Sequence, residues 1–148
     1  MKLDTIVVGF DGSPTALRAL DTAAQLVADT GVVHVVTAFR LPSAGDTAGL
    51  LAQMPEEFRI NYNPTAAPEA DLLRAATFLA DRKVDCQPHL VDDHPASAIL
   101  DIADQVDAQL IIVGSRGMSR STRFLRGSVS TRIASHSARS FMVVHDEE

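Results

Sequence analysis

Short apolar runs rich in Val and Ile alternate along this chain with longer segments of helical periodicity. Most of these runs are apolar at successive positions, which is typical of strands that are buried on both faces. Five such strands are expected, over residues 5–10, 32–38, 84–91, 110–113 and 141–144. Because strands that alternate with helices favour a mainly parallel sheet with right-handed crossovers, the sequence predicts a doubly wound α/β fold with helices on both faces.

The segments between the runs carry signals of helix ends. Ser13 and Pro14 supply an N-cap and a proline at the first helical position, and Gly31 can end the helix that they begin. Further helices are expected over residues 68–83, from Pro95 onward, and after Ser128. Pro88 lies inside the third run, and a proline there predicts that this strand is at an edge of the sheet.

The length of 148 residues fits one folded domain that covers residues 1–148. Hydrophobic residues make up 46% of the chain and charged residues 22%, and this balance excludes a disordered chain. The stretch 41–67 is too long for a plain connection, so we expect either a functional loop or a partly ordered one. A short helical turn near Leu50 and Leu51 is compatible with its sequence.

Several classes of protein and of site are disfavoured by what the sequence lacks. Cys86 is the only cysteine, so neither a disulfide framework nor a cysteine-based zinc site is expected. No apolar stretch approaches the roughly 20 residues of a membrane span, and the start of the chain is unlike a signal peptide. We therefore expect a cytoplasmic protein with no membrane partner. The histidines share no metal-ligand spacing and are expected on the surface or in strands; they include His34, His89, His136 and His145.

The net charge of −6 hides an uneven distribution of charge along the chain. Between Ser115 and Arg139 there are six arginines and no acid, whereas the remainder carries seven basic residues and all 19 acidic ones. Such a local concentration of arginine suits one localised anion. A nucleic-acid partner is not expected, because Phe124 is the only aromatic residue of this segment and the acidic remainder would repel a duplex.

A glycine-rich segment follows the fourth predicted strand and contains most of these arginines. Gly114 and Gly117 allow close backbone approach and expose N–H groups, and Arg116 adds positive charge beside them. Gly127 and Ser128 follow at the expected start of a helix, where free amides and the helix dipole favour an anion. The order of strand, glycine loop and helix suits a phosphate site. Spacing alone leaves open an ordinary strand-to-helix turn with solvated arginines.

Better-known phosphate loops and the hydrolase turn are absent from the sequence. No lysine follows Gly127, so a Walker A loop is unsupported, and residues 9–12 lack the third glycine of the dinucleotide-binding fingerprint. The sequence of residues 114–117 is not the G-x-S-x-G turn of a serine hydrolase. Nothing offers a general base at the phosphate site, so we assign no catalytic residue and expect at most slow hydrolysis of a nucleotide.

The pattern G-x2-G-x9-G-[S/T] resembles the ATP-binding branch of the universal stress protein family. Four residues form the pattern here: Gly114, Gly117, Gly127 and Ser128. The opening sequence 6–13 looks like the first strand and turn of that family, and residues 94–113 are similar to a third family stretch, a helix that leads into the characteristic sequence here at 108–117. The resemblance covers nearly the whole chain outside 41–67. It implies a five-stranded parallel sheet of the Rossmann-like, adenine nucleotide alpha hydrolase-like type, with ATP bound at the strand ends.

The resemblance also implies a role for each residue that matches the family pattern. Asp11 would accept hydrogen bonds from the ribose or adenine, although Asp-Gly-Ser is also ordinary turn chemistry before a helix. The other implied nucleotide contacts are Gly9, Phe10, Ala38, Val113, Gly114, Gly117, Gly127, Ser128 and Val129. The last four of these would hold the phosphates. Mg²⁺ or Mn²⁺ would enter with the phosphates, because no dedicated carboxylate cage is visible.

These features together predict a nucleotide-dependent regulator or adaptor that works with a protein partner the sequence does not identify. A slow ATPase or nucleotidyl-transfer enzyme that uses the same residues is one alternative, and an interaction module with a vestigial site is another. The strand 141–144 lies at a sheet edge in the resembling family, so we expect a two-fold homodimer with antiparallel pairing there. Asp146 and the two glutamates after it would limit further association.

Overall fold

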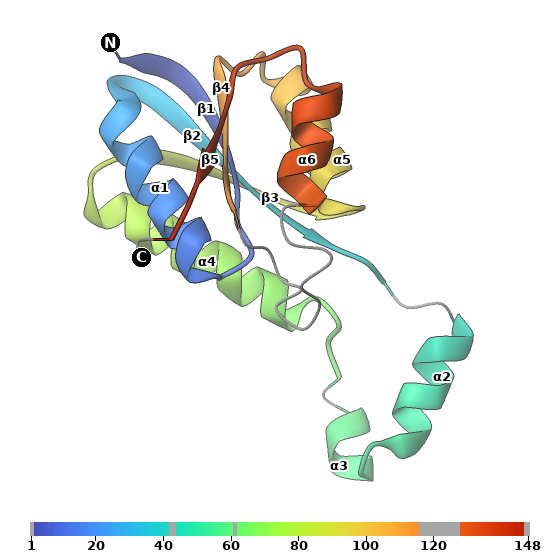
Figure 1. Cartoon of the computed structure of the whole chain (residues 1–148). Coiled ribbons are helices and arrows are strands. Elements are labelled where there is room, and N and C mark those ends of the chain that lie inside the picture. Colours follow the sequence, from blue (N-terminus) through green and yellow to red (C-terminus); the bar gives the residue numbers. More distant parts are fainter. Residues whose placement is uncertain (1, 42–43, 61, 116–127, 147–148) are drawn as a thin grey trace.

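The computed structural model describes residues 2–41, 44–60, 62–115 and 128–146, and it shows a five-stranded parallel sheet with helices on both faces (Figure 1). The strands are β1 (Leu3–Gly9), β2 (Val27–Phe39), β3 (Asp85–Asp92), β4 (Leu110–Gly114) and β5 (Phe141–Val144). The helices are α1 (Pro14–Leu26), α2 (Ala44–Gln53), α3 (Glu56–Arg59), α4 (Ala66–Asp81), α5 (Pro95–Gln105) and α6 (Ser128–His136). The predicted doubly wound α/β fold is confirmed.

The strands are ordered β3-β2-β1-β4-β5 across the sheet. The chain therefore winds outward from β1 through β2 to β3, and it then crosses back to the other side of β1 to form β4 and β5. The order reverses between β1 and β4, and ligands of open α/β sheets bind outside the carboxyl ends of the strands at such a reversal. The position of β3 at an edge confirms the prediction from Pro88, which lies beside Val35 of β2.

Two hydrophobic cores flank the sheet, one under α1 and α4 and the other under α5 and α6 (Figure 1). Successive residues of a strand point to opposite faces, so β1 sends Ile6 and Val8 into the first core and Val7 into the second. All three side chains are fully buried. Burial of one such side chain stabilises the fold by roughly 1.5–3 kcal/mol, so the central strands form the rigid base of the site.

The structure corrects the predicted end of the first helix. The helix ends before Val27, and Gly31 lies inside β2 instead of terminating α1. The register between β1 and β2 shifts between Leu3 and Thr5, opposite this part of β2. A Cβ atom at Gly31 would lie 2.9 Å from the carbonyl oxygens of Leu3 and Asp4. Glycine is needed there because the two strands approach closely.

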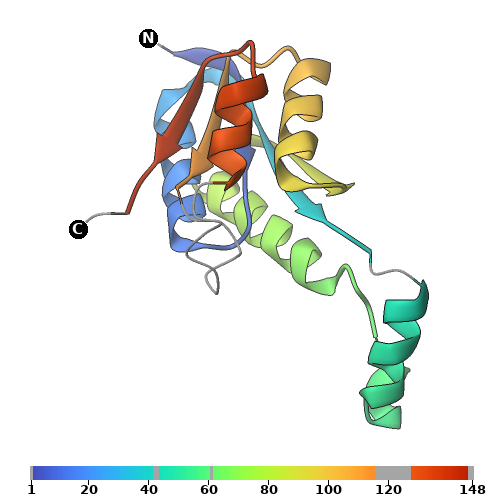
Figure 2. The same cartoon turned by 45° about the vertical axis from the view of Figure 1, so that its right-hand side comes forward.

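Residues 44–60 form an arm of two helices, α2 and α3, that projects away from the sheet (Figure 2). The stretch is thus partly ordered, and α2 is longer than the short turn expected around Leu50. Arg59 links the two helices, because its Nε donates to the carbonyl oxygen of Met54 at 3.0 Å and its Nη2 to that of Ala52 at 3.1 Å. Neither these helices nor any other in the described ranges is long and apolar enough to cross a membrane.

Candidate functional site

Residues singled out from the sequence meet at the carboxyl ends of β1 and β4, on either side of the reversal in strand order. Gly9 ends β1 and Gly114 ends β4, and the turn that follows β1 leads directly into α1. We call residues 9–15 together with residues 113–115 the candidate site. Ala38 lies beside it, near the same end of the neighbouring strand β2.

The backbone of Phe10 is fixed to β2 by two hydrogen bonds. Its N–H donates to the carbonyl oxygen of Val36 at 2.9 Å, and its carbonyl oxygen accepts from Thr37 Oγ1 at 2.8 Å. Phe10 and Thr37 are both buried, so these bonds are shielded from water. The chain therefore leaves β1 along one defined path, and this path sets the position of Asp11.

Asp11 begins the turn between β1 and α1. Its Oδ1 accepts a hydrogen bond from the N–H of Ser13 at 2.9 Å, and Ser13 Oγ in turn accepts from the N–H of Ala16 at 3.2 Å and caps α1. The turn chemistry considered for Asp11 is thus present, and it occupies one carboxylate oxygen. Within the described residues, Oδ2 has no hydrogen-bond partner, so Asp11 can hold the turn and still offer an acceptor to a ligand.

A second carboxylate, that of Asp71 on α4, lies over the same turn. Gly12 has a φ of +80°, and a Cβ atom there would lie only 2.6 Å from Asp71 Oδ1. Burial raises the pKa of the Asp71 carboxyl, the negative charge of Asp11 raises it further, and Arg74 at 3.6 Å opposes both. Two acidic groups therefore share this side of the candidate site, which favours hydrogen-bond donors of a ligand on this side.

The opposite side of the candidate site is built where α1 packs onto the end of β4. A Cβ atom at Gly114 would lie 2.5 Å from Thr15 Oγ1 and 3.0 Å from the backbone carbonyl carbon of Thr15. Only glycine fits there without displacement of the helix. Val113, just before it, is buried in the core under α5 and α6.

Ser115 completes the end of β4 and was not assigned a role from the sequence. Its N–H donates to the carbonyl oxygen of Val144 at 2.8 Å, and its residue surface is only 6% exposed. Its Oγ has no hydrogen-bond partner in the described part of the chain. An unsatisfied buried polar group costs roughly 1–3 kcal/mol, so this hydroxyl can accept a partner beyond the described residues, such as a ligand. A hydroxyl residue directly after a buried strand and its terminal glycine was the signal for it in the sequence.

Of the other residues predicted to contact the nucleotide, the structure describes only some. Ser128 is exposed and Val129 is half-buried in the first turn of α6. Arg116, Gly117 and Gly127 lie outside the described residues. In the ranges that the structure does describe, no three His, Cys, Asp or Glu side chains gather as a metal site would require. The site therefore offers a carboxylate, a buried hydroxyl and backbone groups, which suit a polar ligand rich in hydroxyl and amino groups.

Comparisons with known proteins identify the family and the fold of the chain. The sequence model of the universal stress protein family matches residues 2–145. The universal stress protein Rv1636 of Mycobacterium tuberculosis is 28% identical over 145 aligned residues, which cover 95% of both chains. A solved universal stress protein in complex with cAMP is 28% identical, covers 98% of both chains and has a TM-score of 0.68. The universal stress protein of Archaeoglobus fulgidus in complex with dAMP shares the fold at 24% identity, with a TM-score of 0.64 over 97% of this chain and 99% of that one.

Proposed function

Because the chain belongs to the universal stress protein family, we propose that it binds an adenine nucleotide at the candidate site and acts in the cytoplasm as a nucleotide-dependent regulator or adaptor. The observation that carries the proposal is a pair of groups at the strand-order reversal, one carboxylate oxygen of Asp11 and the hydroxyl of Ser115, neither of which has a hydrogen-bond partner among the residues that the structure describes. Two solved proteins of the same fold hold cAMP and dAMP, which supports an adenine nucleotide as the class of ligand. ATP is the member of that class that we expect here.

The nucleoside part of the ligand would lie across the ends of β1, β2 and β4. Asp11 Oδ2 is suited to accept hydrogen bonds from ribose hydroxyls or from the adenine amino group. Ala38 would contact the adenine. Gly9 and Phe10 would line the site through their backbone, and Val113 and Gly114 would border the ribose.

The phosphate groups would lie against the start of α6. Ser128 and Val129 lie in the first turn of that helix, where the backbone N–H groups and the helix dipole favour an anion. Gly117, Gly127 and the Arg116 guanidinium would complete this part of the site. Mg²⁺ or Mn²⁺ bound to the phosphates would keep most of its water ligands.

The first experiment identifies the ligand class. Mass spectrometry of small molecules released from freshly purified protein is expected to detect an adenine nucleotide. Calorimetry with ATP, ADP, AMP and cAMP then ranks their affinities. If none of the four binds at millimolar concentration, the proposal is wrong. Release of phosphate from ATP well above that of a Ser128→Ala control would favour the alternative of a slow ATPase.

Asp11 allows a sharper test because its two oxygens have separate roles. Asp11→Asn keeps an Oδ1 acceptor for the N–H of Ser13 but replaces the free carboxylate oxygen by an amide donor. We expect normal stability and a loss of affinity of about tenfold, since a hydrogen bond to a charged group contributes roughly 1.5–3 kcal/mol. Asp11→Ala is expected to lose both affinity and stability. Asp101→Asn, on the exposed surface of α5, is the matched control and should change neither.

The arm supports the adaptor part of the proposal. Phe58 and Ile60 have exposed fractions of 61% and 81%, and Leu50 of 40%, so the arm presents apolar side chains that its own helices do not cover. Exposed apolar groups of this kind mark surfaces where partners bind. Removal of Phe58 and Ile60 by alanine substitution is expected to leave nucleotide affinity unchanged and to reduce capture of a partner.

We also propose a homodimer through β5, which is an edge strand whose Phe141 is 39% exposed. An open apolar edge invites pairing with a second copy. Light scattering is expected to give twice the mass of the chain, and Phe141→Lys, which places a charge on that edge, is expected to weaken the dimer. A monomer at all concentrations would contradict this part of the proposal.

A further inference from the structure

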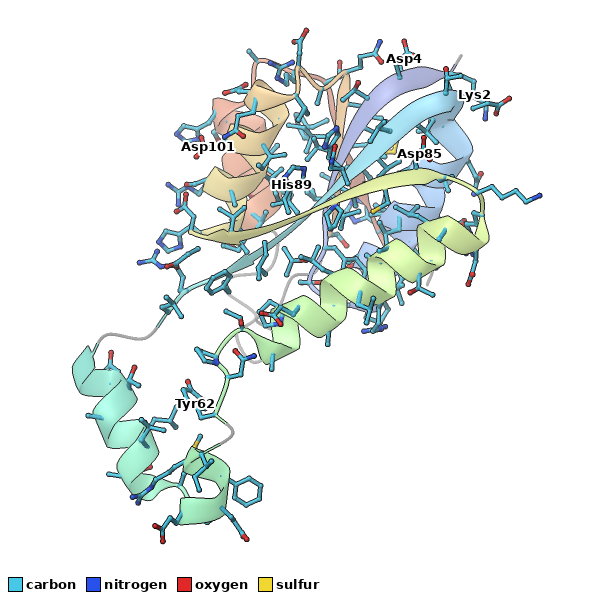
Figure 3. All side chains as sticks on the ribbon, turned by 180° about the vertical axis from the view of Figure 1, so that it is seen from behind. Lys2, Asp4, Tyr62, Asp85, His89 and Asp101 are labelled. Carbon is cyan, nitrogen blue, oxygen red and sulfur yellow. The ribbon has the colours of Figure 1, made fainter. Side chains whose placement is uncertain are left out.

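Two histidines on neighbouring strands form a direct contact that the proposed nucleotide site does not use. His34 lies on β2 and is 8% exposed, and His89 lies on the edge strand β3, where Figure 3 labels it. In the sheet, His89 is the register partner of Val36, and His34 is the register partner of Gln87. The two imidazoles are therefore diagonal neighbours on one face of the sheet, the face covered by α5.

The geometry requires a proton to be shared between the two rings. His34 Nδ1 and His89 Nε2 are 2.9 Å apart, and the ring centroids are 5.2 Å apart. One of these nitrogens must carry a hydrogen and the other a lone pair, which is possible while at least one ring is neutral. When both rings are protonated, two N–H groups and two positive charges face each other, and the bond cannot exist.

Among the described residues, no carboxylate compensates the charge that protonation would bring. Burial lowers the pKa of both rings, and His89 lowers the pKa of His34 further. The acidic residues of β2, β3 and α5 are exposed, and none of them raises the pKa of either ring. They are Asp29, Asp85, Asp92, Asp101 and Asp104. His94 at the start of α5 is also exposed, and Asp104 is bonded to Arg139. Burial therefore opposes a charge on either ring, and acid places charge where the described residues supply no counter-ion.

The segment of β2 beside this pair also holds the candidate site in place. Val36, opposite His89, accepts the hydrogen bond from the N–H of Phe10, and Thr37 donates to the carbonyl oxygen of Phe10. Asp11 follows Phe10 directly. A displacement of β2 at Val36 would therefore move the acceptor on which ribose or adenine binding is proposed to depend.

We propose that His34 and His89 form a proton-operated switch, in which protonation separates β3 from β2 beside Val36 and weakens nucleotide binding at Asp11. The second half of this proposal rests on the proposed function, whereas the first half does not. Linkage makes the coupling reciprocal: if protons lower the affinity for nucleotide, nucleotide must lower the affinity of the pair for protons.

The first test needs no nucleotide. NMR spectra of the ligand-free protein, recorded from about pH 8 to pH 5 with a chelator present, follow the two imidazoles and the backbone amides of Phe10 and Thr37. Because the bond persists until both rings are charged, we expect these amide signals to follow the second imidazole protonation, with a midpoint below the ordinary histidine pKa of 6.5. In His89→Gln the two amide signals should no longer follow that titration, whereas the exposed control His136→Gln should behave as the wild type. Amide signals that do not follow the imidazoles in the wild type would overturn the switch.

The second test measures coupling, with cAMP as the probe because its phosphodiester does not titrate near neutral pH. On going from about pH 7.5 to pH 5.5, we expect the affinity of the wild type to fall at least about fivefold, the lower end of ordinary allosteric coupling. His89→Gln should lose most of this dependence, and His136→Gln should retain it. Equal affinity at both pH values in the wild type would overturn the coupling and leave the proposed function intact. If neither cAMP nor ATP binds at pH 7.5, the proposed function is wrong. The NMR titration of the ligand-free protein would still show whether protonation of the histidine pair moves β2.

Discussion

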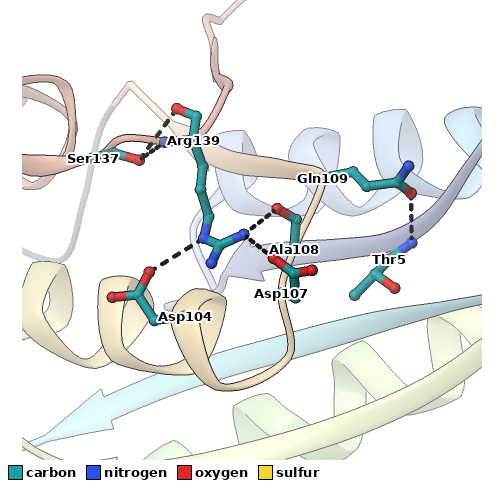
Figure 4. Close-up of polar contacts among 7 residues, drawn as sticks. All are labelled: Thr5, Asp104, Asp107, Ala108, Gln109, Ser137 and Arg139. Carbon is teal, nitrogen blue, oxygen red and sulfur yellow. Dashed lines mark hydrogen bonds and ion pairs between the residues drawn. The ribbon is translucent and has the colours of Figure 1, made fainter.

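The two ends of the sheet differ in how their polar side chains are hydrogen-bonded. At the amino ends of the strands, polar side chains are bonded to the chain itself (Figure 4). Gln109 Oε1 accepts from the N–H groups of Asp4 and Thr5, at 2.6 Å and 3.2 Å. Arg139, which stands just before β5, donates to Asp104 at 3.2 Å and to Asp107 at 2.9 Å. It also donates to the carbonyl oxygen of Ala108 at 2.9 Å.

At the carboxyl ends, two polar atoms of the described residues lack a hydrogen-bond partner and two carboxylates lie close together. Ser115 Oγ is buried and unpartnered, and one carboxylate oxygen of Asp11 is free within the described residues. Asp71 lies over the turn with a raised pKa. Buried polar groups are normally hydrogen-bonded, so unsatisfied ones mark the place where the fold gives up stability. The described polar groups are thus paired within the chain at the amino ends, whereas the carboxyl ends hold the groups that we propose for the ligand.

We expect the largest effect where a side chain is added between the carboxyl end of β4 and α1, which lie in close contact at Gly114. Gly114→Ala places a methyl group against the backbone of Thr15, so α1 must move. Overpacking of this kind costs about 1–3 kcal/mol, measured by urea unfolding, and nucleotide affinity should fall with it. Gly49→Ala on α2 is the matched control, because a Cβ atom there meets nothing within 4 Å and alanine favours a helix by about 1 kcal/mol. Equal unfolding free energies for the two variants would contradict the packing described here.

Arg139→Met tests the amino end of the sheet. The methionine keeps most of the apolar stem of the side chain but removes the donors to Asp104, Asp107 and Ala108. We expect a lower unfolding temperature with a smaller loss than for Gly114→Ala, and unchanged nucleotide affinity. The difference from the wild type should shrink in high salt, because the two carboxylates are exposed. A loss of nucleotide affinity at unchanged stability would remove the distinction between the two ends.

Ser115→Ala should change stability in the opposite direction. Without ligand, removal of a buried hydroxyl that has no partner among the described residues is expected to stabilise the protein by up to about 1 kcal/mol or to leave it unchanged. Nucleotide affinity should fall, because the hydroxyl would then be missing from the complex. Thermal unfolding with and without ATP measures both effects on one sample. A clear loss of stability in the ligand-free variant would show that the hydroxyl has a structural partner.

The smallest effect is expected at Asp71. A carboxyl whose pKa is raised in the folded state contributes stability below its ordinary value of 3.8, and this contribution is lost as the pH rises through the raised value. Asp71→Asn should therefore be slightly more stable than the wild type at neutral pH. The advantage should disappear in acid, and unfolding curves at several pH values measure it. A variant that is less stable at neutral pH would show that the ion pair with Arg74 outweighs burial and the charge of Asp11.

Hydropathy patterns predict the sheet well because burial on both faces leaves a direct mark on the sequence. The edge position of β3 follows from Pro88, and the cap of α1 follows from Ser13 and Pro14. Gly31 was misassigned because a glycine needed for close strand contact has the same appearance in the sequence as one that ends a helix.

Other contacts depend on how strands and helices align in the fold, and the spacing of residues along the sequence does not predict them. His34 and His89 are 55 residues apart and meet only because β2 and β3 pair in one alignment. The burial of Ser115 and the position of Asp71 over Gly12 likewise result from packing between elements that are distant in the sequence. The glycine pattern and the strand order point to the same end of β4, because ligands of open α/β sheets bind at the carboxyl ends of strands beside a reversal in order.

The most direct test of the difference between the two ends is an NMR titration of the amide signals with ATP. We predict shifts at Phe10, Asp11 and Ser115 that saturate with ATP, and unchanged signals at Gln109 and Arg139. Shifts confined to the amino ends of the strands, or none at millimolar ATP, would contradict the assignment of nucleotide binding to the carboxyl ends of β1 and β4.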